Sequence, residues 1–126
     1  MKKSNIYFLL FVIGFLLNAC TYDFIVKEEL APVDPTVDIL FATQITPIFT
    51  NGCVSCHKTG GQAPDLSAAN AYASIKSMNL VNTAAAETSP LYNYPNPAST
   101  IHTWKKYSAS EAQLVLTWIQ QGAKNN

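Results

Sequence analysis

The clearest pattern of hydrophobic and polar positions lies near the C-terminus and predicts a helix. Ser108-Ala109-Ser110-Glu111 is a capping box, in which a serine and a glutamate three positions later satisfy the first free N–H groups of a helix. Apolar residues then recur at helical spacing: Ala112, Val115, Leu116 and Ile119, with Trp118 beside them. Gly122 is the expected end of this helix.

Two further helices and one short helical turn are predicted upstream. Thr46 is expected to cap a helix that has Pro47 in its first turn, where the missing N–H of proline costs nothing. The apolar face of that helix would be Ile45, Ile48 and Phe49. The alanine-rich segment from Ser67 to Ser77 predicts a second helix, with these side chains inward: Ala71, Tyr72, Ile75 and Met78.

Between these helices, turn-forming residues predict irregular backbone. Ser89 is expected to cap a brief helical turn at Pro90-Leu91-Tyr92, and Pro95 and Pro97 would then keep the chain extended. No stretch alternates hydrophobic and polar residues as a strand requires. The sequence therefore predicts a small all-α domain with long loops.

The N-terminal segment has the pattern of an export signal. Lys2 and Lys3 precede an apolar run from 6 to 17, which is too short for a comfortable membrane span. The run ends in Leu17-Asn18-Ala19-Cys20, which resembles a bacterial lipobox, although Asn18 is an unusual occupant of its position. We expect residues 1–19 to be a signal peptide and Cys20 to carry lipid; the alternatives are an uncleaved anchor helix or a free thiol.

Composition changes at the end of this signal. Residues 20–37 carry acidic residues and two prolines without a helical period, and they are expected to form a flexible tether to a domain at 38–126. The precursor has 8 basic and 8 acidic residues, and removal of Lys2 and Lys3 leaves the mature chain mildly acidic. Arginine is absent, so no basic patch favours nucleic acid as a partner.

The main chemical motif is Cys53-Val54-Ser55-Cys56-His57. Two cysteines three positions apart with a histidine directly behind them are the pattern for covalent attachment of one c-type haem. Each thiol can form a thioether with a porphyrin vinyl group, and His57 can ligate the iron. A thioredoxin-type redox pair would need a strand and a helix around the motif, and a zinc site would need ligands that the chain hardly supplies.

With these pieces in order, the chain resembles a single-haem cytochrome c domain, of the small exported cytochrome c-like type common in Bacteroidetes and planctomycetes. Besides the haem motif, these segments carry the resemblance: Ile45-Thr46-Pro47-Ile48-Phe49, Pro64-Asp65-Leu66, Ala71-Tyr72, Leu80-Val81-Asn82, Ser89-Pro90-Leu91-Tyr92 and Trp118-Ile119-Gln120-Gln121-Gly122-Ala123. The resemblance covers most of the mature chain. It implies a haem held between an N-terminal and a C-terminal helix that cross.

The sixth ligand of the iron is the point at which the chain departs from this family. Many relatives place a methionine between the Ser-x-Leu turn and the last helix, whereas the segment from 96 to 107 holds His102 and no methionine. Three possibilities stay open: His102, Met78, or a site open to water. His102 is favoured because it stands in the loop where the family has its distal ligand.

These observations predict a non-enzymatic, membrane-tethered cytochrome that passes single electrons among exported or membrane redox proteins. The first alternative is a haem-based sensor or small peroxidase with an open distal site. The second is a binding module of surface carbohydrate metabolism, which a stand-alone chain of 126 residues makes less fitting. No feature of the sequence indicates an oligomer.

Overall fold

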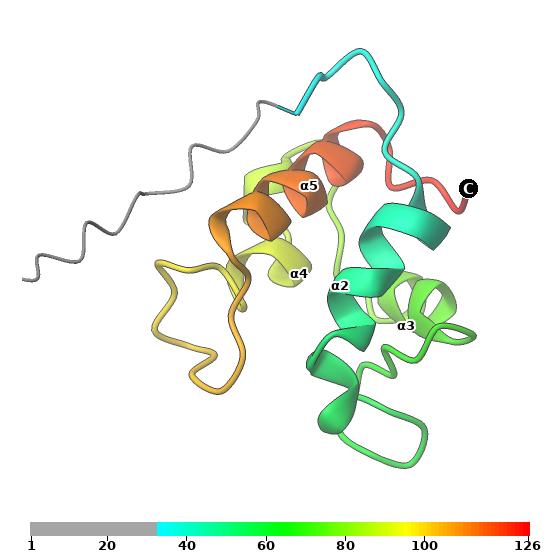
Figure 1. Ribbon diagram of the computed structural model, residues 1–126, viewed down its shortest axis with the longest axis vertical. Helices are drawn as coiled ribbons and strands as arrows, with labels where there is room; N and C mark the ends of the chain where they lie inside the picture. The colour runs from blue at the N-terminus through cyan, green and yellow to red at the C-terminus, as the bar shows by residue number, and fades with distance from the viewer. Residues whose placement is uncertain (1–32) are drawn as a thin grey trace, which may run out of the picture.

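The computed structural model describes residues 33–126, and helices are the regular elements in this part of the chain (Figure 1). They are the π-helix η1 (Phe41–Ile45), α2 (Thr46–Thr50), the 3₁₀ turn η2 (Cys53–Ser55), α3 (Ala71–Ser77), the 3₁₀ turn η3 (Ala86–Thr88), α4 (Pro90–Asn93) and α5 (Ala109–Gln120). The all-α prediction is confirmed for residues 33–126, where no strand occurs. The predicted signal peptide at 1–19, the lipidation site Cys20 and tether residues 20–32 lie outside the described residues.

Helix α5 follows the sequence prediction closely. The Ser108 hydroxyl accepts a hydrogen bond from the Glu111 N–H at 3.1 Å, and the Glu111 carboxylate accepts one from the Ser108 N–H at 2.7 Å, so the capping box is confirmed. All but one of the predicted apolar positions are buried, Leu116 being half-buried. Gly122 ends the helix with a φ of 97°, a conformation that costs glycine little. None of the helices in the described part is long and apolar enough to cross a membrane.

The first helical segment begins earlier than predicted. Thr46 was expected to be a cap, but its side chain makes no capping bond and it lies inside a continuous segment formed by η1 and α2. The segment starts after Leu40, whose N–H donates to the Gln44 side chain at 2.7 Å. No side chain among the described residues caps the start of this segment, and the prediction of Thr46 as cap is wrong.

The boundaries of α3 and α4 also depend on side chains that bond elsewhere. Helix α3 begins at Ala71 rather than Ser67, because Asp65 accepts both the N–H and the hydroxyl of Ser67 and so holds a turn there. Met78, expected inward, is 44% exposed. Ser89 occupies the N-cap position of α4, but its hydroxyl accepts from the Asn82 N–H at 2.8 Å instead of capping the helix.

The core is centred on an aromatic cluster at one end of the domain. The ring of Phe41 lies 5.3 Å from that of Trp118, 5.2 Å from that of Tyr72 and 6.4 Å from that of Phe49, measured between centroids. Trp118 is 1% exposed, and its indole N–H donates to the Lys124 carbonyl at 2.9 Å. Helix α5 packs on η1 here and on η3 and α4 further along. We call this cluster, with η1, α5 and the segment that follows α5, the packed end.

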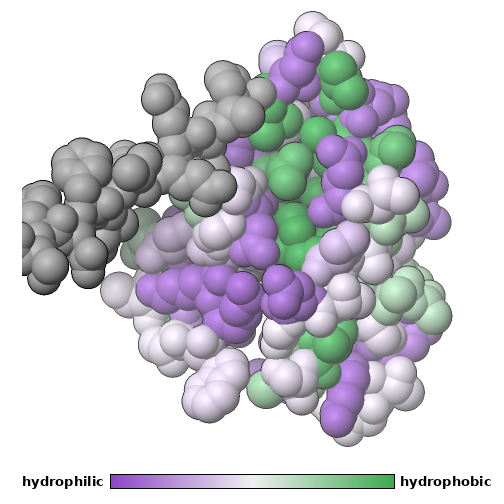
Figure 2. Space-filling model, viewed as in Figure 1, coloured by the Kyte–Doolittle hydropathy of each residue, from purple (hydrophilic) through white to green (hydrophobic). Residues whose placement is uncertain are grey.

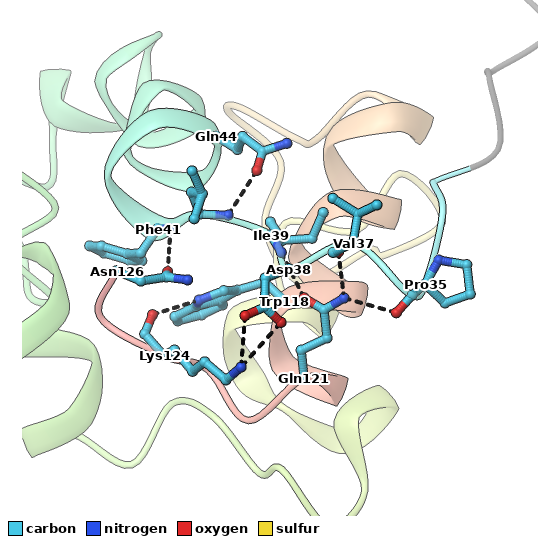
Figure 3. Close-up of polar contacts among 11 residues, drawn as sticks. Pro35, Val37, Asp38, Ile39, Phe41, Gln44, Trp118, Gln121, Lys124 and Asn126 are labelled. Carbon is cyan, nitrogen blue, oxygen red and sulfur yellow. Dashed lines mark hydrogen bonds and ion pairs between the residues drawn. The ribbon is translucent and has the colours of Figure 1, made fainter.

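Polar bonds join the two chain segments that meet at the packed end (Figure 3). The Gln121 side chain accepts from the Ile39 N–H at 2.7 Å and donates to the carbonyls of Val37 at 2.9 Å and Pro35 at 3.2 Å. The Lys124 ammonium pairs with Asp38 at 3.0 Å. Hydrogen bonding to the domain thus extends back to Pro35, inside the segment that the sequence assigned to the tether.

At the opposite end the chain is mostly loop, and several large apolar side chains are exposed there. They are Trp104 at 85%, Ile101 at 72%, Tyr94 at 48% and Met78 at 44%. On the face of the molecule shown in Figure 2, hydrophobic residues come to the surface between hydrophilic ones. Val37 at 60% and Leu40 at 42% are exposed as well, but Met78, Tyr94 and Trp104 line one cavity. Exposed apolar side chains around a cavity indicate a surface that binds something.

Candidate cofactor site

A cavity of about 350 Å³ opens at this second end, and the residues of the haem motif line it. Its lining is Gly52, Cys53, Ser55, Cys56, His57, Gln62, Ala63, Pro64, Leu66, Met78, Leu80, Pro90, Leu91, Tyr94, Pro95, His102, Trp104, Lys105 and Tyr107. We call this region the cavity end. The volume falls in the ordinary range for ligand pockets, and a mostly apolar wall with a few convergent polar groups is the usual composition of such a site.

The motif itself forms one tight turn. Gly52 has a φ of 113°, and the chain then turns through η2 so that the N–H groups of Cys56 and His57 both donate to the Cys53 carbonyl, at 3.1 and 2.9 Å. This turn brings both thiols and the imidazole to one cavity. Cys53 is half-buried, and burial raises the pKa of its thiol, whereas Cys56 is exposed.

His57 is held from two sides by the loop that follows the motif. Its ring Nδ1 lies 3.1 Å from the Pro64 carbonyl oxygen, which can only accept, so Nδ1 carries the hydrogen. Its backbone carbonyl accepts from the Leu66 N–H at 2.8 Å. The other ring nitrogen, Nε2, therefore carries the lone pair that a metal ion requires.

His102 lies in the loop from 95 to 107, which we call the His102 loop. The Tyr107 N–H closes the base of this loop on the Pro95 carbonyl at 2.7 Å, and the buried Tyr107 hydroxyl donates to the Leu91 carbonyl at 3.0 Å. The imidazole of His102 faces that of His57, with ring centroids 6.2 Å apart and ring planes 27° from parallel. Its Nδ1 is buried and has no hydrogen-bond partner among residues 33–126.

The distance between the two rings is compatible with one metal ion bound between two imidazoles. A metal–imidazole bond of about 2.0–2.1 Å, added to about 1.1 Å from ring nitrogen to ring centre, places two such centroids roughly 6.3 Å apart. The observed 6.2 Å agrees with this value. An unpaired buried nitrogen is costly, so the site contains a polar group that the described part of the protein leaves unsatisfied.

Comparisons with protein-family models, with curated proteins and with solved structures give no match.

Two alternative interpretations of the motif, a zinc site and a thioredoxin-type pair, find no support among residues 33–126. Within the described range, no three His, Cys, Asp or Glu side chains converge as they would around a zinc ion. The strand that a thioredoxin-type motif requires before its helix is missing from residues 33–126. Both predicted cysteines and both predicted histidines line one cavity, and Met78 lies on its lining as well.

Sequence reasoning named the ligand candidates but missed the residues that hold them. Pro64 belongs to a segment that carried the family resemblance, yet its carbonyl had no assigned role. Tyr107 was not singled out, although it is 5% exposed and fixes the base of the His102 loop. A tyrosine directly before the capping box at Ser108, where a large apolar side chain often packs on the helix, was the available signal for it.

Proposed function

We propose that this domain is a c-type cytochrome that carries one covalently bound haem and transfers single electrons. The observation that supports this most directly is the pairing of His57, from the attachment motif, with His102, from a distant loop, at 6.2 Å across one cavity. The motif alone has other uses. The opposed second histidine is what a six-coordinate electron-transfer haem requires in addition.

Four side chains would hold the cofactor. Cys53 and Cys56 would form the thioethers, and Nε2 of His57 and the imidazole of His102 would bind the iron. When bound, the haem supplies one-electron chemistry because its iron is stable in both the ferrous and the ferric state. We assign the chain to the cytochrome c-like fold on the same grounds, with η1 and α2 as its N-terminal and α5 as its C-terminal helix.

Three of the remaining cavity residues form a buried part of the wall. Leu66 and Leu91 are each 6% exposed and Tyr107 is 5% exposed, so this part of the wall is dry. A dry wall lowers the local dielectric constant, which strengthens the effect of every charge on the electron affinity of the site. Two protein ligands leave no position for substrate, so we propose a carrier rather than an enzyme.

We further propose that the domain is exported and tethered through lipid on Cys20, so that it exchanges electrons with exported or membrane redox proteins. The bonds of Gln121 to Pro35 and Val37 attach the N-terminal segment at the packed end. None of residues 33–41 lines the cavity. A tether attached there leaves the cavity end free to meet a partner.

The test is haem staining of the protein, exported alongside a cytochrome c maturation system and run on a denaturing gel. Thioethers survive denaturation, so the wild type should stain. The double variant Cys53→Ala, Cys56→Ala should not stain. The matched control is Ser55→Ala, which alters the same turn without removing a thiol and should stain like wild type. A colourless wild type would refute the proposal.

The main alternative, a sensor or peroxidase with an open distal site, is separated by a visible spectrum of the same preparation. Six-coordinate low-spin iron at rest supports the electron carrier. A resting high-spin iron that binds carbon monoxide without displacing a protein ligand would favour the alternative.

A further inference from the structure

Asp65 is the centre of a hydrogen-bond cluster beside the cavity. One carboxylate oxygen accepts from the N–H of Ser67 at 2.9 Å and from its hydroxyl at 2.6 Å. The other accepts from the Thr59 hydroxyl at 2.7 Å and from the Asn70 side-chain amide at 2.9 Å. The Ser67 and Thr59 bonds, with that of Asn70, hold the pKa of Asp65 well below its usual range, so the carboxylate is ionised at neutral pH.

The two residues on either side of Asp65 are the ones that hold His57. Pro64 accepts from the ring Nδ1 at 3.1 Å, and Leu66 donates to the His57 carbonyl at 2.8 Å. Asp65 itself donates its backbone N–H to the Ser74 hydroxyl in α3 at 2.9 Å. The tripeptide 64–66 is thus fastened to the motif through its ends and to the surrounding loop and α3 through Asp65.

We infer that Asp65 is a positioning residue for the proposed axial ligand His57. It makes no contact with His57. It fixes the peptide whose carbonyl orients the imidazole, selects the Nδ1–H tautomer and leaves Nε2 for iron. A firm hydrogen bond from Nδ1 also makes the ring a stronger donor, which favours ferric over ferrous iron. This inference rests on the proposed function, because it assigns Asp65 a role in tuning the haem of that site.

The chain contains a matched control for this cluster. Asp34 accepts from the N–H of Thr36 at 2.9 Å and from its hydroxyl at 2.7 Å, as Asp65 does from Ser67. Its pKa is likewise lowered by these bonds. Asp34 does not line the cavity and its neighbours do not bond a cavity histidine, so the same turn occurs there without the proposed consequence.

The experiment uses the haem-loaded protein and measures two quantities: the midpoint potential, and the solvent-exchange rate of the His57 Nδ1 proton by NMR in the ferrous state. Asp65→Ala should speed proton exchange and raise the potential. If the preference for ferric iron falls tenfold, the rise is about 59 mV. Asp34→Ala should leave both quantities at wild-type values.

Removing a negative charge near the haem would raise the potential by itself, so a second variant keeps the charge. Thr59→Val deletes one of the four hydrogen bonds and leaves Asp65 ionised. It should change the midpoint potential and the exchange rate in the same direction as Asp65→Ala, but by a smaller amount. If Asp65→Ala fails to fold or to attach haem, Thr59→Val alone still tests the inference.

Two results would overturn the inference. One is a potential shift in Asp65→Ala with unchanged Nδ1 exchange, which would mean that only the charge matters. The other is a wild-type potential and exchange rate in Thr59→Val. Both presuppose a haem-stained wild type, whereas a colourless wild type would defeat the proposed function instead, so the two failures are distinguishable.

Discussion

Trp118 and Trp104, the two tryptophans of the chain, lie at the packed end and the cavity end respectively. The first is 1% exposed, stacks near Phe41 and donates its N–H to a carbonyl. The second is 85% exposed although it lines the cavity. At the packed end, side chains of the protein satisfy one another.

At the cavity end, by contrast, side chains do not satisfy one another. The buried Nδ1 of His102 has no hydrogen-bond partner among the described residues. A domain of this size buries a smaller fraction of its surface than a large one. The comparison suggests that one half of this core is made of side chains and that the other is completed by a ligand. Substitutions at the two ends should therefore have different effects.

The largest expected effect is at the cavity end, where His102→Ala should remove the sixth ligand altogether. Ferric iron should become high-spin, and the ferrous form should bind carbon monoxide. Met78→Ala is the matched control and should leave the spectrum unchanged, because Met78 lines the same cavity but is 44% exposed. If the two variants exchange behaviour, Met78 is the ligand and the pairing of histidines has another cause.

The next effect contrasts the two tryptophans directly. Trp118→Ala should lower the free energy of unfolding by about 3–5 kcal/mol, because it deletes a buried ring and leaves a cavity. Trp104→Ala should cost within about 0.5 kcal/mol, as expected for an exposed side chain. Denaturant unfolding of the haem-loaded variants measures both. A cost above about 1 kcal/mol for Trp104→Ala would show that bound haem buries this ring.

The sequence predicted the elements whose causes are local. The capping box of α5 lies within four consecutive residues, and the stripe behind it follows from helical spacing, so both were readable. The beginning of η1 was missed because no side chain of the described residues caps it, whereas Thr46-Pro47 has the usual pattern of a helix start. Ser67 was placed in a helix because nothing in its own residue type shows that Asp65 binds it.

The residues of the candidate site also differ in whether local sequence determines their positions. Cys53, Cys56 and His57 are adjacent in sequence, and their shared cavity follows from one turn. The approach of His102 depends on the path of the whole chain between the two histidines, which spacing does not specify. Its position in the loop was anticipated only through the family resemblance. The support of His57 by Pro64 was out of reach, since any carbonyl in that loop could accept the bond.

A smaller effect concerns Tyr107, which lines the cavity together with Leu91 and donates its hydroxyl to the Leu91 carbonyl. Burial raises the pKa of its hydroxyl far above the ordinary value. The folded state therefore retains a proton that the unfolded state releases above about pH 10. Stability is fully present below that pH and falls as the pH rises beyond it.

Tyr107→Phe should remove this fall and, at neutral pH, cost about 1–3 kcal/mol because the Leu91 carbonyl loses its donor. The difference between wild type and variant should thus shrink as the pH is raised from 9 to 11, measured by denaturant unfolding. A constant difference across that range would mean that the hydroxyl ionises freely in the folded protein.

The smallest effect is expected on the surface of the packed end, where two polar contacts of different kinds join the same segments. Lys124→Ala removes an ion pair with Asp38 whose side chains are 53% and 59% exposed, so it should cost less than about 1 kcal/mol and nothing in 1 M salt. The backbone carbonyl that accepts from Trp118 is retained in this variant.

Gln121→Ala removes three neutral hydrogen bonds to the chain at 35–39 and should cost more, about 1–2 kcal/mol, at low and high salt alike. Unfolding of both variants at two salt concentrations separates the contributions. If Lys124→Ala were the costlier change, or if its cost persisted in salt, charge rather than hydrogen bonding would hold the N-terminal segment to the packed end. The cavity end should be indifferent to both substitutions, and an unchanged haem spectrum in each variant is the measurement that shows it.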